Sequence, residues 1–137
     1  KAVKFRESFR PFAPAVLDLD VKKIFQIPKN RKVYFMERAY KIKKEWRNKI
    51  PAVNHVDNTG RVQTVTKGIN NKFYKLIEEF KEITGIPVLL NTSFNLNGEP
   101  IVNTVDDALR TFFTSLFSNE DPPFKCASGC HDRQRCR

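Results

Sequence analysis

Residues 70–90 constrain the fold more than any other stretch of the chain. The first part of this stretch carries apolar side chains at helical spacing: Phe73, Leu76, Ile77, Phe80 and Ile83. Asn70 or Asn71 can cap the start of such a helix, and Gly85 can end it. A short apolar run at residues 86–90 follows at once, which is typical of a buried strand entered directly from a helix. The stretch therefore predicts an αβ unit.

A second helix is expected further along the chain. Thr104 and, three residues later, Asp107 resemble a capping box with Asp in the place of Glu. The apolar face of this helix would comprise Val105, Ala108, Leu109, Phe112, Phe113 and Leu116. The polar stretch NTSFNLNGEP, residues 91–100, thus lies between a buried strand and a helix. In open α/β sheets, ligands often contact the loop that leaves the carboxyl end of a strand.

Further strands are expected in the first half of the chain. Residues 52–56 and 61–66 predict two strands, which the turn sequence DNTG would join as a hairpin. Residues 33–42 and 12–17 predict two more strands. Because strands and helices alternate without an internal repeat, the expected class is α/β, bordering on α+β, with a mixed sheet.

The polar loop carries the first candidate binding residues. The hydroxyl and amide groups of Asn91, Thr92, Ser93 and Asn95 can donate and accept hydrogen bonds, so they could hold phosphate or ribose oxygens without adding charge. Gly98 would let the backbone approach a ligand or take a positive φ. A turn rich in asparagine can also cap its own backbone, and this alternative stays open.

A basic segment near the N-terminus carries the second group. If residues 4–10 are extended, one face holds Lys4, Arg6, Ser8 and Arg10, and the other holds Phe5 and Phe9. Three cations would then face one anion, and arginine can bind phosphate oxygens bidentately. A solvated basic edge strand is the alternative.

His55 and Arg61 form the third group. The expected hairpin would bring the imidazole of His55 close to the guanidinium of Arg61 or its neighbours, which suits a site for phosphate. A packed or surface histidine without a role in chemistry is the alternative.

Charge and cysteine content narrow the partners. The 25 basic residues exceed the 15 acidic ones, and 15 of the basic residues but only 5 of the acidic ones lie in residues 1–49, which favours anionic partners. Residues 119–137 are expected to be a disordered tail. The spacing of Cys126, Cys130, His131 and Cys136 in this tail matches no common zinc motif, so no metal site is predicted.

Location and completeness can also be judged from the sequence. The chain has no apolar run long enough to span a bilayer and no signal peptide, so a cytoplasmic protein without a membrane partner is expected. Because the chain begins with Lys1 and its composition changes after Ser118, we expect a fragment of a longer protein.

Three motifs, taken together, resemble one family. KFRESFRPFAPAVL, IPAVNHVDNTGRVQTV and TGIPVLLNTSFNLNGEPIVNTVDDAL resemble the C-terminal domain of the O-carbamoyltransferases of nodulation-factor and antibiotic tailoring, over about residues 3–113. That domain is similar to the YrdC-like threonylcarbamoyladenylate synthases, whose Lys-x-Arg and Thr-Ser-x-Asn elements bind ATP. The matching residues here are Lys4, Arg6, Thr92, Ser93 and Asn95. The resemblance implies a YrdC-like open twisted mixed sheet with flanking helices in residues 1–118.

The resemblance also implies a reaction. Such domains use ATP, with Mg²⁺, and carbamoyl phosphate to make carbamoyl adenylate, which an N-terminal domain containing Fe²⁺ transfers to a substrate hydroxyl. That N-terminal domain, the expected partner, is missing from this chain. The cations Lys4, Arg6, Arg10 and Arg61 would offset phosphate charge. Ser93 and Asn95 would orient phosphate and ribose, and our hypothesis is that His55 helps to bind or cleave carbamoyl phosphate.

Two other functions remain as alternatives. A threonylcarbamoyladenylate synthase acting in tRNA modification ranks lower, because HVDNTGRVQTV and FRPFAP belong to the carbamoyltransferase pattern. A nucleic-acid binding module built on the basic front half ranks lower still, and it would bind with a steep dependence on salt. Family members continue after the last helix into another apolar strand, which this chain lacks. The resulting open sheet edge makes a homodimer an assembly to test.

Overall fold

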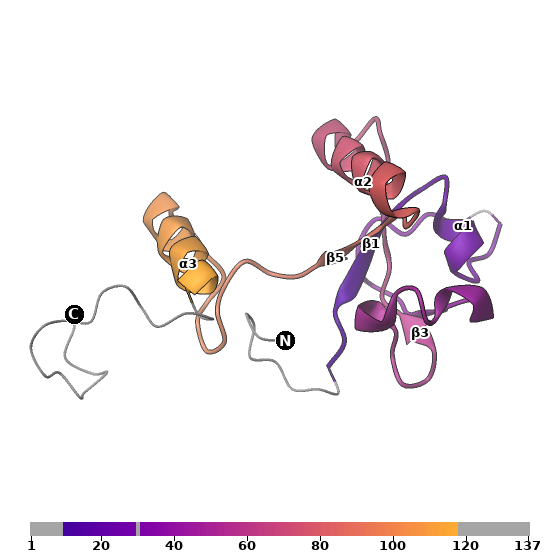
Figure 1. Cartoon of the computed structure of the whole chain (residues 1–137), viewed down its shortest axis with the longest axis horizontal. Helices are drawn as coiled ribbons and strands as arrows, with labels where there is room; N and C mark the ends of the chain where they lie inside the picture. The colour runs from indigo at the N-terminus through magenta and orange to yellow at the C-terminus, as the bar shows by residue number, and fades with distance from the viewer. Residues whose placement is uncertain (1–9, 30, 118–137) are drawn as a thin grey trace, which may run out of the picture. The chain divides into compact units, whose positions relative to one another are not determined.

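The computed structural model describes residues 10–29 and 31–117 (Figure 1). These residues fall into two compact units, of which one ends at Ser93 and the other begins at Phe94. Lys4, Arg6 and the tail of residues 119–137 lie outside the described residues. Among the described residues, no helix combines the length and apolar character needed to cross a membrane.

The first unit is built on a three-stranded sheet in the order β4 (Gln63–Val65), β1 (Ala13–Leu17) and β5 (Val88–Asn91). Strand β1 runs parallel to β4 and antiparallel to β5. Two helices belong to the same unit, α1 (Val21–Ile24) and α2 (Asn71–Thr84). The prediction of an α/β fold with a mixed sheet is therefore confirmed.

Strand β1 is buried at both edges by the other two strands, and on both faces by two apolar clusters. Val16 packs into a large apolar cluster with the buried side chains of α1 and of several loops. Ala15 and Leu17, which point to the opposite face, pack with Tyr74 and Ile77 of α2. A strand covered on both sides explains the nearly continuous apolar run in the sequence.

Helix α2 begins and ends as the sequence predicts. The side chain of Asn70 accepts a hydrogen bond from the backbone N–H of Phe73 at 3.1 Å, which satisfies one free donor of the first turn. Gly85 ends the helix at φ 72°, and its N–H bonds to the carbonyl of Lys81 at 2.7 Å. The strand that follows, β5, begins two residues later and ends one residue later than expected, so it includes Asn91.

The predicted hairpin is wrong. Pro51–Val53 forms a 3₁₀ helix, β3 (Thr59–Gly60) pairs with β2 (Tyr40–Lys41), and β4 joins β1 in the other sheet. The chain passes from one sheet to the other where Gly60 lies close to its neighbours. A Cβ there would lie 3.1 Å from both the Phe25 ring and the Val53 carbonyl. The local pattern predicted a turn here, but the first arm is not a strand, and the second arm pairs with β1.

The strand expected over residues 33–42 is also mostly absent. Only β2 and an isolated bridge between Ile42 and Phe25 are extended pairings. Earlier in this segment, the carbonyl of Val33 accepts bonds from both the N–H and the hydroxyl of Thr64, at 2.6 and 2.7 Å. The segment is therefore held at single points along its length rather than by a continuous ladder. A second 3₁₀ helix, Lys44–Trp46, follows it.

The second unit contains helix α3 (Val105–Phe117). Its predicted capping box is confirmed. The N–H and hydroxyl of Thr104 donate to Asp107 Oδ2 at 3.2 and 2.8 Å, and the N–H of Asp107 donates to the Thr104 hydroxyl at 3.1 Å. The pKa of Asp107 lies below its usual value, and the largest cause is the hydrogen bond from the Thr104 hydroxyl.

Candidate functional site

One end of the three-stranded sheet brings several of the predicted site residues together. Arg10 precedes β1 by three residues, Arg61 precedes β4 by two, and Thr92 and Ser93 directly follow β5. The register pairs Ala13 with Asn91, and β4 is parallel to β1. The starts of β1 and β4 and the end of β5 therefore meet at the same end, which we call the site end.

The polar groups of the site end differ in what they do. Arg10, Arg61 and Ser93 are exposed and Thr92 is half-buried, so all four can be reached from solvent. The side-chain amide of Asn91 instead donates to the side-chain oxygen of Gln63 at 2.9 Å. This bond connects the two strands that flank β1. Asn91 is therefore a structural residue at the edge of the site.

His55 belongs to a loop that is anchored at the site end. The backbone N–H of Phe12, just before β1, bonds to the carbonyl of Ala52 at 3.2 Å, and His55 follows three residues later. The loop is closed by two backbone bonds, from His55 N–H to the Thr59 carbonyl at 2.8 Å and from Asn58 N–H to the His55 carbonyl at 2.9 Å. Asn58 takes a positive φ of 61°, a conformation that asparagine tolerates better than most residues.

The side chains of this loop form a chain of hydrogen bonds. The hydroxyl of Thr59 donates to Asp57 Oδ1 at 2.7 Å, and His55 Nδ1 lies 3.1 Å from the same hydroxyl oxygen. The N–H of Thr59 also donates to Asp57 Oδ1, at 3.1 Å. The hydrogen bonds from Thr59, side chain first and then backbone, lower the pKa of Asp57. Asp57 is therefore ionised at neutral pH.

This chain of bonds fixes the position of the proton on His55. A threonine hydroxyl carries one hydrogen, and an ionised carboxylate can only accept, so the hydrogen of Thr59 lies toward Asp57. The hydroxyl oxygen must then accept from His55, which places the imidazole proton on Nδ1. The other ring nitrogen, Nε2, is unprotonated in the neutral side chain. In this neutral form, Nε2 is a hydrogen-bond acceptor or a base rather than a donor.

Asn95 lies in the second unit and supports its own turn. Its side-chain amide donates to the carbonyl of Glu99 at 2.7 Å, and the N–H of Leu96 donates to the Glu99 carboxylate at 3.4 Å. Gly98, between them, takes φ 81°, as the sequence suggested. The alternative of an asparagine turn that caps its own backbone therefore describes the amide group of Asn95 correctly.

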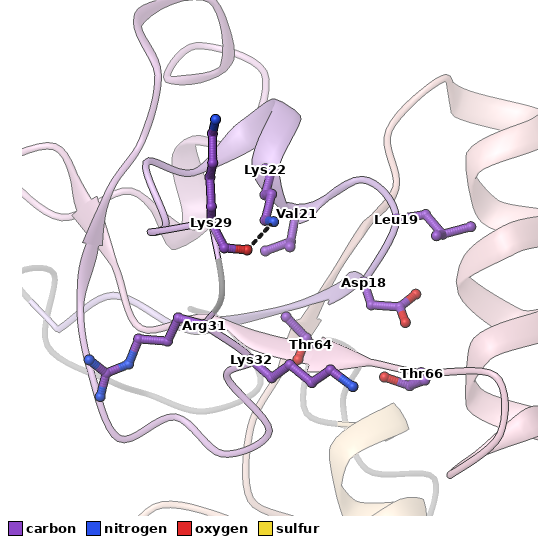
Figure 2. A pocket seen from close by; sticks show the side chains of 9 residues that line it. All are labelled: Asp18, Leu19, Val21, Lys22, Lys29, Arg31, Lys32, Thr64 and Thr66. Atoms are coloured by element: carbon purple, nitrogen blue, oxygen red, sulfur yellow. Dashed lines mark hydrogen bonds between the residues drawn. The ribbon is translucent and has the colours of Figure 1, made fainter.

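A pocket of about 440 Å³ lies at the opposite end of the sheet. There the carboxyl ends of β1 and β4 are joined by a bond from the Asp18 N–H to the Val65 carbonyl at 3.1 Å. The described residues that line this basic pocket are drawn in Figure 2: Asp18, Leu19, Val21, Lys22, Lys29, Arg31, Lys32, Thr64 and Thr66. Four of them are basic and one is acidic.

Sequence reasoning missed two parts of this arrangement. It gave Lys22 no role of its own, although the concentration of positive charge in the first 49 residues was a signal for a basic pocket. It also missed Thr59 as the partner of His55, although an aspartate two residues before a threonine is a common local bonding pattern. Among the described residues, no three His, Cys, Asp or Glu side chains are grouped to hold a metal ion.

The chain resembles known proteins over most of its length. A family model described as carbamoyltransferase C-terminus matches residues 1–118. Over 114 residues the chain is 47% identical to the nodulation protein NolNO of Sinorhizobium fredii, covering 82% of this chain and 17% of that protein. It is 45% identical over 114 residues to the nodulation protein NolO of Bradyrhizobium diazoefficiens, covering 82% of this chain and 21% of that protein.

A further relative comes from an archaeon. An uncharacterized protein of Methanocaldococcus jannaschii is 43% identical over 110 residues, which cover 80% of this chain and 18% of that protein. The chain therefore spans about a fifth of the length of the curated relatives it matches.

Proposed function

The chain belongs to the carbamoyltransferase C-terminus family, and from this premise we propose that it is the part of an O-carbamoyltransferase that binds ATP and carbamoyl phosphate. It would form carbamoyl adenylate, and the remaining, N-terminal part of a longer protein would transfer the carbamoyl group to a substrate hydroxyl. The observation that carries the proposal is the meeting of Arg10, Arg61, Thr92 and Ser93 at one end of the sheet.

The two arginines suit the electrostatic demand of this reaction. ATP and carbamoyl phosphate are both anions, so holding them together is unfavourable without cations. Arg10 and Arg61 precede adjacent parallel strands and are exposed at the same end of the sheet. They would offset phosphate charge and fix the geometry of attack. Lys4 and Arg6, outside the described residues, are proposed to add to the same effect.

Hydroxyl and amide groups would orient the nucleotide. Thr92 and Ser93 directly follow β5, and Asn95 lies two residues further. Their uncharged donors suit the oxygens of phosphate and ribose. None of Arg10, Arg61, Thr92 and Ser93 carries a carboxylate, the usual protein ligand of Mg²⁺, so Mg²⁺ would arrive bound to ATP and offset part of the phosphate charge.

His55 would act as a base in the cleavage of carbamoyl phosphate. Water would attack the carbamoyl carbon, the C–O bond to phosphate would break, and inorganic phosphate would leave, so that carbamate remains. The unprotonated Nε2 of His55 would take a proton from that water. A carbamate oxygen would then attack the α-phosphorus of ATP, forming carbamoyl adenylate while pyrophosphate leaves. Fe²⁺ is expected only in the missing N-terminal part.

Isothermal titration of the chain with ATP-Mg, with and without carbamoyl phosphate, tests the proposal. We expect saturable binding that a Ser93→Ala, Asn95→Ala variant loses. A matched control, Asn97→Ala with Asn103→Ala, removes two exposed polar side chains from the same region and should keep the affinity. Equal loss in both variants, or pyrophosphate release that requires threonine and bicarbonate instead of carbamoyl phosphate, would overturn it.

A further inference from the structure

We propose that the basic pocket at the carboxyl ends of β1 and β4 is a second anion site, which takes a small molecule bearing several phosphate groups. This site is separate from the proposed nucleotide site, because the two lie at opposite ends of β1, about 13 Å apart by the rise of an extended strand. The carboxyl ends of parallel strands are a frequent place for ligands in α/β sheets.

The charge of the pocket is not balanced by the chain itself. Lys22, Lys29, Arg31 and Lys32 line it, and Asp18 is the only acid among the described lining residues. None of the ion pairs formed by described residues includes any of these four cations. Like charges that are gathered without a counter-charge repel one another, so an anionic ligand would relieve this repulsion.

The acid closest in sequence to α1 cannot balance them either. The side chain of Asp20 is 3% exposed, and each of its oxygens already binds an ammonium group, from Lys23 at 2.7 Å and from Lys81 at 2.8 Å. Its negative charge is therefore committed to those two lysines. An anionic ligand would therefore have to neutralise the positive charge of the pocket.

The backbone that carries the cations is anchored at two points. Lys22 Nζ donates to the carbonyl of Lys29 at 2.6 Å, which connects α1 to the segment that contributes the other cations. Val33 directly follows the cations in the chain, and its side chain is fully buried. The carbonyl of Val33 accepts a hydrogen bond from the hydroxyl of Thr64 in β4. Ordered anchors on both sides distinguish this pocket from a set of lysines on a freely moving surface segment.

The directions of the side chains favour a ligand with more than one anionic group. Figure 2 shows Lys29, Arg31 and Lys32 leaving the backbone in three different directions, with the ammonium of Lys32 on the side of Asp18 and Thr66. These cations border the pocket rather than meet at one point. A single phosphate could contact only part of this border, whereas a chain of phosphates could reach several cations.

The shape of the site favours a small molecule over a nucleic acid. A volume of about 440 Å³ lies within the range of pockets for small ligands. A nucleic-acid backbone is normally bound by cations arranged along an extended stripe or face. The hydroxyl of Thr66, which also lines the pocket, can donate to phosphate oxygens.

The test is a calorimetric titration of the chain with inorganic tripolyphosphate at constant ionic strength. We expect saturable binding that Arg31→Ala with Lys32→Ala weakens by about tenfold or more. The matched control is Lys72→Ala with Lys75→Ala, which removes two exposed cations from α2 and should leave the affinity unchanged. Because all four side chains are exposed, the fold should survive, and amide spectra would verify this.

Four outcomes would overturn the proposal. No saturable binding, or equal weakening by the pocket and control variants, would mean that only general positive charge attracts the probe. Loss of binding in Ser93→Ala, Asn95→Ala but not in the pocket variant would place the probe at the nucleotide site. Tight binding of a single-stranded oligonucleotide without binding of tripolyphosphate would indicate a nucleic-acid surface. A failure of ATP binding alone would reject the proposed function and leave this inference standing.

Discussion

At the site end of the sheet the polar side chains bind one another, whereas at the basic pocket the cations have no acidic partner among the described residues. Asn91 bonds to Gln63, and His55, Thr59 and Asp57 form a chain of hydrogen bonds. Such bonds hold groups in one geometry before a ligand arrives. Substitutions at the site end should therefore act through geometry, and substitutions at the pocket through charge, with a dependence on salt.

The largest effect is expected from Arg61. If the proposed function holds, Arg61→Ala should weaken the binding of carbamoyl phosphate by about 10- to 100-fold, because the proposed bidentate hydrogen bond to phosphate would be lost. Arg61→Lys keeps the charge but not the fork and should recover only part of the affinity. Calorimetry with the chain measures both. Full recovery by lysine would show that the site end also works by charge alone, and the contrast between the two ends would fail.

Asp20 gives the next largest effect, on stability. Asp20→Asn should lower the free energy of unfolding by about 2 kcal/mol. The substitution removes the buried negative charge, so Lys23 and Lys81 each lose a charge-assisted hydrogen bond. Urea unfolding measures the change, and Asp106→Asn, on an exposed residue of α3, is the control. A loss no larger than in the control would mean that the ties from Asp20 to Lys23 and Lys81 contribute nothing.

The pH dependence of this effect has a definite sign. Burial acts to raise the pKa of Asp20, but the hydrogen bonds and charges of Lys23 and Lys81 outweigh it, so the pKa lies below the usual 3.8. A group with a lowered pKa stabilises the fold above its unfolded value and ceases to do so as the pH falls through the folded value. The difference between Asp20→Asn and the unaltered chain should therefore be full at neutral pH and shrink below about pH 3.8.

The sequence predicted local features well because they depend on near neighbours. The caps of α2 at Asn70 and Gly85 and the capping box of Thr104 with Asp107 are formed within a few residues. The entry into β5 follows from the same logic. The hairpin was wrong because the partner of residues 63–65 is β1, about fifty residues away in sequence, and no local pattern encodes that choice.

The candidate site was predictable in composition but not in arrangement. Thr92 and Ser93 could be placed after a strand from the apolar run before them. Arg10 and Arg61 lie at the same end of the sheet as Thr92 and Ser93 because β1 runs parallel to β4 and antiparallel to β5. The basic pocket was missed for a related reason, since Lys22 and Arg31 come together only through the contacts that fold residues 18–33 against β4.

A smaller effect is expected from Thr59. Thr59→Val keeps the β-branched shape but removes the hydroxyl, so the proton of neutral His55 should shift from Nδ1 toward Nε2, and the affinity for carbamoyl phosphate should change only a few-fold. Thr59→Ser should restore the original form. Nitrogen NMR of the imidazole measures the ratio directly, and the chain has only 2 histidines to assign. An unchanged ratio in Thr59→Val would show that the site end does not hold His55 in one form.

The smallest effect should come from the pocket in the absence of a ligand. Lys32 is exposed, and neither an ion pair nor a hydrogen bond joins it to another described residue, so Lys32→Gln removes repulsion without removing a contact. The free energy of unfolding should rise, by no more than about 0.5 kcal/mol, at low salt and return to that of the unaltered chain as salt screens the charges.

Lys23→Gln is the opposite case, because Lys23 binds Asp20, and it should lower stability. Urea unfolding of both variants at two salt concentrations separates paired from unpaired cations. If Lys32→Gln were destabilising, or if its effect were independent of salt, the cations of the pocket would be partners of the fold rather than a charge reserved for a ligand.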